Sequence, residues 1–330
     1  GEKPLGWVRE QNAISQKELA SSPSFESLRT RLLAIYDSKD KIPTPNVMAG
    51  RLYNFWRDEA HPRGLWRRTT LAEFKKPAPQ WETVIDLDAL GKAESERWVW
   101  KSANCLYPKY ERCLVGLSRG GADAVVVREF DTVKKAFVPG GFTLPEAKTQ
   151  ASWKNLDTIY VGTDFGPGSL TDSGYARIAK EWKRGTPLSE ASAIYEGKKT
   201  DVAVFAYREF DHGKSYDWVG RAPSFFTSEA MLNEQGKLTK LEKPDDAEAD
   251  IWGDQLIIRP RTDWLTGATT WPAGSLLATK LADFLAGKRE FSVLFRPTPS
   301  TSLDSWVATK NAIFVVELED VKSGLYRHTL

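Results

Sequence analysis

Two stretches within the first 45 residues repeat apolar side chains at the spacing of an α-helix. The first begins at Trp7 and the second at Phe25. Ser21-Ser22-Pro23 precedes the second stretch and is typical of a helix start. Pro43 then ends the pattern, because proline lacks a backbone donor and restricts the residue before it. The sequence therefore predicts a helical N-terminal segment over residues 1–45.

From about residue 48 the pattern changes to short apolar or alternating runs, separated by Gly, Pro, Asp and Asn. Three pairs of runs predict β-hairpins: residues 52–56 with 65–70, 114–118 with 124–130, and 313–318 with 325–328. Long helical patterns are scarce here, and residues 275–285 fit either a helix or a strand. Residues 46–330 are therefore expected to be all-β.

Tryptophan residues recur at intervals that fit a repeat of about 50 residues. Trp98, Trp153, Trp252 and Trp306 are separated by about 55, 99 and 54 positions. Repeats of this length built from hairpins are typical of β-propellers, in which each blade buries its faces against its neighbours. Blades starting near residues 51, 98, 153, 202, 251 and 306 predict five blades and part of a sixth, with room for two or three strands in the last.

A second repeat is shorter. Arg128-Glu129-Phe130-Asp131 recurs as Arg208-Glu209-Phe210-Asp211, about 80 residues later. We expect the two segments to occupy equivalent strands of blades that are two apart.

Several long segments occur in an order that characterises one family. They are residues 7–12, 52–58, 62–70, 117–123 and 127–131. In these segments the chain resembles the prolyl oligopeptidase family of serine peptidases, and the likeness spans essentially the whole sequence. The resemblance implies an N-terminal helical segment, a seven-bladed β-propeller and a C-terminal α/β-hydrolase domain. In that family the hydrolase domain holds the Ser, Asp and His that cleave short peptides after proline.

We expect the resemblance to cover only part of the family pattern, without the seventh blade and the hydrolase domain. It implies a propeller truncated to five blades and part of a sixth, with residues 1–45 packing on a hydrolase domain in the intact protein. The implied function is to gate access to the peptidase site, with that domain and short peptides as partners. No catalytic residue, cofactor-binding residue or metal ligand is expected in this chain. The alternative is a stand-alone propeller that binds a protein or a peptide.

One motif suggests a nucleophile. Gly116-Leu117-Ser118-Arg119-Gly120 matches the Gly-x-Ser-x-Gly elbow, which requires a strand-to-helix turn that exposes the Ser hydroxyl. Here a Gly-Gly-Ala-Asp turn follows, and then a β-branched run from Ala124 to Val127 that is typical of a strand. We therefore expect Ser118 to lie at the end of a β-strand and to have no catalytic role.

The other candidate motifs favour structural roles. The sequence places His61 and His212 beside turn residues, and no two of the three histidines have the spacing of a metal pair. Gly213-Lys214-Ser215 lacks the first glycine of a phosphate-binding loop and predicts a hairpin turn. Residues 166–168 lack the third glycine of a dinucleotide fingerprint. The acidic run at residues 245–250 lacks the spacing of a calcium loop and predicts an exposed loop between blades.

The composition of the chain bears on its binding partners and on its cell compartment. Lysine and arginine total 46 against 44 acidic residues, so the net charge of +2 gives no footprint for nucleic acid or for an anionic membrane. No apolar run approaches the length of a membrane span, and the N-terminus lacks a signal-peptide pattern. Cys105 and Cys113 are expected to be free thiols in a reducing compartment, with a single bridge as the alternative. These features favour the cytoplasm, with the periplasm as the alternative.

Overall fold

The computed structural model describes residues 1–38 and 40–330. The chain forms two compact units, residues 1–98 and residues 99–330, and each is described by itself. In the first unit, two helices precede the strands, as the apolar spacing predicts. They are α1 (Glu2–Leu19) and α2 (Phe25–Tyr36), and neither contains a buried residue.

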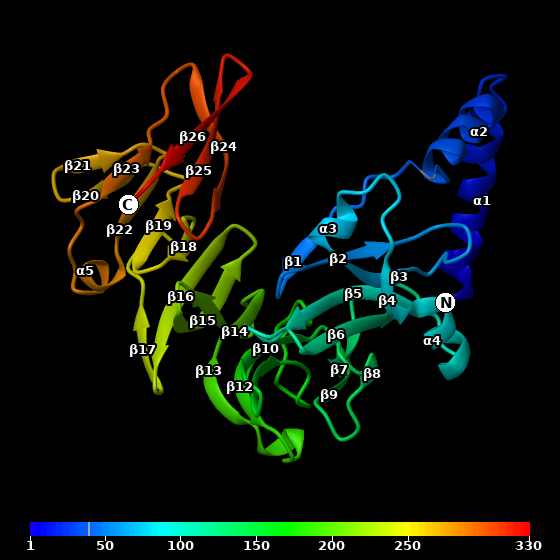
Figure 1. Cartoon of the computed structure of the whole chain (residues 1–330), viewed down its shortest axis with the longest axis horizontal. Coiled ribbons are helices and arrows are strands. Elements are labelled where there is room, and N and C mark those ends of the chain that lie inside the picture. Colours follow the sequence, from blue (N-terminus) through cyan, green and yellow to red (C-terminus); the bar gives the residue numbers. More distant parts are fainter. Residues whose placement is uncertain (39) are drawn as a thin grey trace. The chain divides into compact units, whose positions relative to one another are not determined.

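Among the described residues, six antiparallel sheets of three to five strands follow one another along the chain (Figure 1), and we number them as blades 1 to 6. Blade 1 contains β1 (Asn46–Met48), β2 (Arg51–Trp56), β3 (Leu65–Thr70) and β4 (Glu82–Asp86). Blade 2 contains β5 (Trp98–Cys105), β6 (Arg112–Arg119), β7 (Val125–Asp131), β8 (Ala136–Phe137) and β9 (Thr143–Ala147). Blade 3 contains β10 (Gln150–Asn155), β11 (Thr158–Gly162), β12 (Ile178–Lys183) and β13 (Ser192–Glu196).

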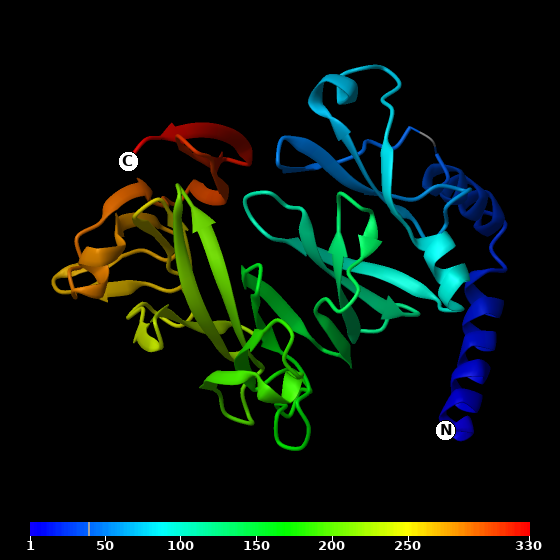
Figure 2. The same ribbon diagram turned by 60° about the horizontal axis from the view of Figure 1, so that its bottom comes forward.

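Blade 4 contains the longest strands, which are best followed in Figure 2: β14 (Ala203–Asp211), β15 (Lys214–Ser224), β16 (Thr227–Glu234) and β17 (Lys237–Lys240). Blade 5 contains β18 (Glu248–Trp252), β19 (Gln255–Arg259), β22 (Leu276–Lys280) and β23 (Ser292–Phe295), with a separate hairpin of β20 (Trp264–Thr266) and β21 (Thr269–Trp271). Blade 6 contains β24 (Thr301–Ala308), β25 (Ile313–Glu319) and β26 (Lys322–His328).

These sheets make the fold an all-β propeller with six blades, and each sheet begins close to a residue that the repeat predicts. All four spaced tryptophans lie in first strands, in β5, β10, β18 and β24. The three predicted hairpins are also confirmed, since β2 pairs with β3, β6 with β7, and β25 with β26. Blade 6 has three strands in the described part of the chain.

Helices beyond the N-terminal segment are short. They are α3 (Leu71–Phe74), α4 (Leu87–Glu94), α5 (Leu281–Leu285) and the 3₁₀ turn η1 (Leu188–Glu190). The ambiguous stretch at residues 275–285 divides into strand β22 and helix α5, so both interpretations apply to part of it. None of the helices in the described residues has the length and apolar character that crossing a bilayer requires.

Within the second unit, antiparallel pairing of successive strands gives every blade two distinct ends. The chain enters each first strand at one end, which we call the linker end, and reaches the second strand at the other, which we call the turn end. Contacts confirm this assignment at two places. Asp320 N, in the β25–β26 turn, donates to the carbonyl of Ser300, which lies in the linker into blade 6. Ser228 N, near the β15–β16 turn, donates to the carbonyl of Asp245 in the linker into blade 5.

The apolar cores of the second unit lie between consecutive blades, as a propeller requires. One cluster joins Phe142 and Leu144 of blade 2 to Trp153 and Trp182 of blade 3. Other clusters join blades 3 and 4, blades 4 and 5, and blades 5 and 6. Each sheet therefore depends on its neighbours for burial of its apolar faces.

The prediction from the four-residue repeat is wrong. Residues 128–131 lie in β7, the third strand of blade 2, whereas residues 208–211 lie in β14, the first strand of blade 4. The blades are two apart, but the strand positions differ. Both strands run towards the turn end and finish at a turn, and any strand of that direction accommodates the same alternation of apolar and charged residues. So short a match carries no information about strand order.

Candidate functional site

Ser118 lies next to last in β6, as the sequence predicts. Its side chain is fully buried, and its hydroxyl has no hydrogen-bond partner among the described residues. The following residues form a turn that leads into β7, so the serine does not sit at the start of a helix. This geometry lacks the exposed hydroxyl and the adjacent base that a nucleophile needs.

The remaining sequence candidates also occupy structural positions. His61 lies between β2 and β3, His212 lies in the two-residue β14–β15 turn, and His328 ends β26. The turn at His212 and Gly213 confirms the predicted hairpin at Gly213-Lys214-Ser215. The acidic run is only partly a loop, because residues 248–250 form the start of β18. No group of three or more His, Cys, Asp or Glu suited to a metal is found among residues 1–38 and 40–330.

The expectation of two free thiols is wrong, because Cys105 and Cys113 form a disulfide. Cys105 ends β5, and Cys113 is the second residue of β6, the strand beside it in the sheet. The hairpin between these strands brings the two side chains together. Their separation of eight positions along the sequence does not reveal this, because it matches no known motif.

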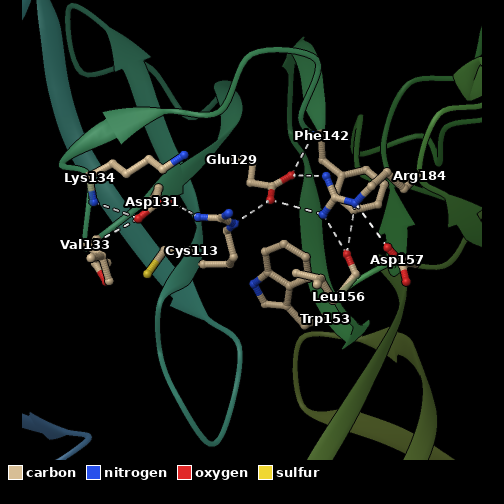
Figure 3. Close-up of polar contacts among 12 residues, drawn as sticks. Cys113, Glu129, Asp131, Val133, Lys134, Phe142, Trp153, Leu156, Asp157 and Arg184 are labelled. Atoms are coloured by element: carbon tan, nitrogen blue, oxygen red, sulfur yellow. Dashed lines mark hydrogen bonds and ion pairs between the residues drawn. The ribbon is translucent and has the colours of Figure 1, made fainter.

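The most extensive buried polar network centres on Glu129 of β7, whose side chain is only 1% exposed (Figure 3). Arg184, which follows β12 in blade 3, donates to both carboxylate oxygens at 2.8 and 3.1 Å. Phe142 N donates to the same carboxylate at 3.0 Å. Arg112 of β6 lies 3.6 Å from it and also pairs with Asp131. A bidentate arginine on a buried carboxylate is among the stronger polar contacts in proteins.

Arg184 is itself fully engaged. Its guanidinium donates to the carbonyl of Leu156 at 2.6 Å and lies 4.6 Å from the ring centroid of Phe142. Asp131 is held as an anion. Burial alone would raise its pKa, but hydrogen bonds from Lys134 N and the Arg112 guanidinium outweigh this and keep the pKa below its usual range. With these donors and acceptors paired, the network is suited to joining blade 2 to blade 3 rather than to binding a ligand.

A second ion pair lies within blade 4 and contacts blade 3 through a backbone carbonyl. Arg208 of β14 donates to both oxygens of Asp217 at 2.7 and 2.6 Å and to the carbonyl of Lys154 in β10 at 2.8 Å. Two open depressions of about 550 and 500 Å³ flank this pair. Charged side chains that line them, such as Lys154 and Glu181 at 2.7 Å, are also paired with each other.

Carboxyl groups with raised pKa values lie on the first strands of blades 4 and 5. Burial, reinforced by Asp250 of β18 and by Asp211, raises the pKa of Glu209 in β14 to about 7. Burial also raises the pKa of Asp250, with Glu248 adding to the effect. Trp218 Nε1 donates to Glu209 at 3.2 Å and limits the shift. These two neighbouring strands therefore carry carboxyl groups whose pKa values are raised chiefly by burial.

We expect Glu209→Gln to flatten the dependence of stability on pH. The folded pKa lies above the ordinary value of 4.5, so between about pH 4.5 and 7 the folded chain binds more protons than the unfolded chain. The free energy of unfolding therefore falls as the pH rises through this window, and a neutral glutamine removes that loss. We therefore compare the free energy of unfolding of Glu209→Gln with that of the wild type. After allowance for solvent screening, we expect this difference to favour the variant by about 1 kcal/mol more at pH 8 than at pH 5.

The measurement is urea unfolding of both proteins at pH 5, 6, 7 and 8. Glu234→Gln, in the exposed β16–β17 hairpin, serves as the control and should track the wild type. Equal slopes for Glu209→Gln and the wild type would contradict the raised pKa.

Contacts at the turn end link four blades of the second unit. Tyr107, in the loop closed by the disulfide in blade 2, stacks on Phe210 of blade 4 with ring centroids 5.1 Å apart. His212, beside Phe210, bonds the Lys310 carbonyl in blade 6 at 2.6 Å, and Tyr216 donates to the Gly253 carbonyl in blade 5 at 2.7 Å. A hydrogen bond to Asp211 and the Lys310 carbonyl raise the pKa of His212. The turn end is therefore tied together by its loops.

Removing the disulfide should loosen this end. We expect the Cys105→Ser, Cys113→Ser double variant to lose about 2 kcal/mol of stability, the amount typical for closing so short a loop. Thermal unfolding with and without a dithiol reductant tests this. Reductant should lower the melting temperature of the wild type and leave the double variant unchanged. Detection of two free thiols in the untreated protein would contradict the bridge.

Sequence reasoning missed the Glu129 network and the Tyr107–Phe210 contact. In the sequence Glu129 is distinguished only by its place in a repeat, and its partner Arg184 lies 55 positions away. The one available signal was a charged residue inside a strand whose neighbours are apolar, because such a residue needs a partner when buried.

Known proteins resemble this chain in sequence over its whole length. The family model for the N-terminal β-propeller domain of prolyl oligopeptidase matches residues 1–329. An uncharacterized peptidase of Sinorhizobium fredii is 36% identical over 334 residues, which cover 98% of this chain and 46% of that protein. An uncharacterized peptidase of Rickettsia prowazekii is 28% identical over 348 residues, which cover 100% of this chain and 48% of that protein. The chain thus spans about half the length of the curated relatives it matches.

Solved structures of peptidases also share the fold of this chain. A post-proline cleaving enzyme from Rickettsia typhi matches with a TM-score of 0.90 and 27% identity, over 99% of this chain and 50% of that one. Oligopeptidase B from Leishmania major matches with a TM-score of 0.70 and 13% identity, over 98% of this chain and 44% of that one. The second likeness concerns the fold alone.

Proposed function

Because the chain belongs to the prolyl oligopeptidase family as an N-terminal β-propeller domain, we propose that it gates access to a serine peptidase site that cleaves short peptides after proline. The observation that carries the proposal is the family match over residues 1–329, together with relatives about twice as long. The catalytic Ser, Asp and His would then lie in a hydrolase domain outside this chain. The similar enzyme from Rickettsia typhi is named for cleavage after proline.

The intact propeller would have seven blades. Blade 6 supports this, because it exposes apolar side chains that a further strand and a neighbouring blade would cover. Val307 is 58% exposed, Leu325 is 70% exposed and Tyr326 is 47% exposed. A propeller blade depends on both neighbours for burial.

The N-terminal segment of residues 1–45 would pack on the hydrolase domain. Helices α1 and α2 leave Trp7 63%, Ile14 58% and Tyr36 73% exposed. Apolar side chains at helical spacing normally face a partner. The disulfide further suggests an oxidising compartment such as the periplasm, because disulfides are rare in the cytosol.

The test compares this chain with the full-length protein on a short chromogenic peptide that contains proline. We expect turnover by the full-length protein and none by this chain alone. Ser118→Ala in the full-length protein should leave kcat/KM within about twofold of the wild type, because Ser118 is buried in a strand.

Two results would overturn the proposal. Turnover by this chain that is abolished by Ser118→Ala would place the nucleophile in the propeller. A full-length protein that binds peptides without cleaving them would favour the binding-scaffold alternative.

A further inference from the structure

Arg67 of β3 lies between two tryptophan rings of blade 1. Its guanidinium carbon is 4.1 Å from the ring centroid of Trp56 and 4.3 Å from that of Trp81. The strand register explains this arrangement. Arg67 pairs with Asn54 of β2, and Trp56 follows Asn54 by two positions. On the other side, Arg67 pairs with Thr83 of β4, and Trp81 precedes Thr83 by two positions. Side chains two positions apart share a face of the sheet, so each neighbouring strand contributes one ring.

One edge of the Arg67 guanidinium is bonded within blade 1. Its Nε donates to Asn54 Oδ1 at 2.8 Å. Asn54 is 7% exposed, and its amide nitrogen donates to the Phe55 carbonyl at 3.2 Å, which fixes the direction of its oxygen. Within residues 1–38 and 40–330, the two terminal Nη groups of Arg67 have no acceptor and form no ion pair. The outer edge of the guanidinium therefore carries a fork of N–H donors that blade 1 does not use.

Other arginines of the chain show that this arrangement is unusual. Arg68, the next residue, lies on the opposite face of β3 and donates to both oxygens of Glu82 at 2.6 and 3.1 Å. In the second unit, Arg184 and Arg208 each hold a carboxylate through two bonds as well. A partly buried charge normally has such a partner, because removing it from water without one is costly. Arg67 is covered by rings on its faces and has no carboxylate of its own.

The carboxylate near Arg67 is that of Asp58, and it is already engaged. Asp58 accepts from Trp56 Nε1 at 3.0 Å and from His61 N and Nδ1 at 2.8 and 2.9 Å. Burial lowers the pKa of Arg67 to about 10, and the charge of Asp58 opposes this shift only in part. The guanidinium is therefore charged at neutral pH and lacks a direct contact with an anion.

We propose that Arg67 is a binding site for a carboxylate group supplied from outside residues 1–330, with Trp56 and Trp81 as its walls. A carboxylate has two coplanar oxygens that match the fork of the Nη groups, so an arginine binds it through two parallel N–H···O bonds. A dianionic phosphate is less suited, because the charge of Asp58 repels a second negative charge. The fixed orientation of the guanidinium reduces the entropy lost on binding. This inference does not depend on peptidase activity.

The carboxylate has two potential sources. One is a free ligand, such as a small organic acid or the C-terminus of a peptide. The other is an Asp or Glu of the protein beyond residue 330, since the curated relatives are about twice as long as this chain. Chemical protection and cross-linking distinguish the two sources.

The first experiment measures access to Arg67 in the full-length protein. Phenylglyoxal reacts with the Nη groups of arginine, and peptide mass spectrometry gives the rate at each position. If the ligand is free, sodium acetate at about 0.1 M should slow the modification of Arg67 roughly tenfold relative to sodium chloride of equal ionic strength, as expected for a Kd of about 10 mM. Arg57 is exposed beside the Phe55 ring and serves as the internal control, with the same rate in both salts.

Two further solutes test the chemistry of the ligand. Acetamide has nearly the same size as acetate and no charge, so it should give no protection. Sodium phosphate should protect Arg67 less than acetate does at equal ionic strength. Stronger protection by phosphate would contradict the assignment of the site to a carboxylate.

The second experiment tests for a carboxylate of the continuing chain. In the Arg67→Lys variant of the full-length protein, a water-soluble carbodiimide joins the lysine amine to a carboxylate in contact with it and takes up the water that is lost. If the continuing chain supplies the group, we expect an amide to an Asp or Glu beyond residue 330. Arg67 of the wild type should then resist phenylglyoxal in both salts. Arg57→Lys is the matched control and should not form this amide.

Protection by acetate, or a cross-link to a residue beyond 330, supports the site and identifies its source. Modification of Arg67 that acetate does not slow, whether fast or absent, together with no such cross-link would overturn the proposal. A cross-link from position 67 to Asp58 would also overturn it, because the partner would then lie within blade 1. Neither readout measures peptide cleavage, so failure of the proposed function leaves this test unaffected.

Discussion

Glu129→Gln is expected to destabilise the second unit by about 3 kcal/mol, because removing one partner of a buried ion pair leaves the other partners uncompensated. The Glu129 side chain is 1% exposed and accepts hydrogen bonds from Arg184 and from Phe142 N. A neutral amide reduces the charge that holds Arg184 and directs its own N–H groups towards a guanidinium. Since domains are stable by only about 5–15 kcal/mol, the loss should be large.

Urea unfolding followed by tryptophan fluorescence measures the effect, because Trp153 lies in the core between the same two blades. Glu196→Gln is the matched control. Glu196 also pairs with an arginine, Arg177, but its side chain is 57% exposed. Exposed ion pairs contribute about 0–1 kcal/mol, so the control should lose less than 1 kcal/mol. Equal losses in the two variants would show that the Glu129 network does not join the blades.

Lys243→Met is expected to destabilise the chain by about 2–3 kcal/mol, because it leaves buried carbonyl groups without their donor. Lys243 lies in the linker between blades 4 and 5 and is 8% exposed. Its ammonium donates to the carbonyls of Ser228, Pro244 and Ala247 at 2.9, 3.2 and 2.7 Å. Burial lowers the pKa of this lysine, and the nearby Asp245 opposes that shift. Methionine has a similar length and no donor.

The measurement is again the urea midpoint, here with hydrogen exchange of the linker amides as a second readout. Lys237→Met, at the exposed start of β17, should change the free energy of unfolding by less than about 0.5 kcal/mol. We expect exchange to accelerate at Ser228 and Ala247, whose amides bond within the linker region. A stable Lys243→Met variant with unchanged exchange would contradict the role assigned to the ammonium group.

Much of the architecture was predictable because it depends on local spacing. The hairpins at β2–β3 and β6–β7 follow from short alternating runs around turn residues, and these patterns identify strands wherever they occur. Trp98, Trp153, Trp252 and Trp306 all lie in first strands. Their regular spacing follows from a repeat in which each blade must bury its apolar faces against its neighbours. The strand position of Ser118 was predictable for a similar reason, since a β-branched run after a turn does not start a helix.

The candidate site was less predictable, because its contacts join residues far apart in the sequence. Arg128-Glu129 and Arg208-Glu209 are the same dipeptide, but Glu129 meets an arginine of the next blade, whereas Glu209 lies near other carboxyl groups. The opposite surroundings arise because the two segments occupy different strands of their blades. Identical residues therefore acquire an ordinary ion pair in one place and a raised pKa in the other.

The sequence by itself determined the helical start, the strand-rich repeat, the number and approximate starts of the blades, and the family. Only the tertiary structure decided that Cys105 and Cys113 form a disulfide, that Arg184 pairs with Glu129, and that Phe225 and Phe226 project from the linker end. The physical reason is the range of the interactions. Strand and turn preferences act within a few residues, so neighbouring residues in the sequence reveal them. The pairing of charges and thiols and the exposure of rings depend on how the strands and blades are placed beside one another.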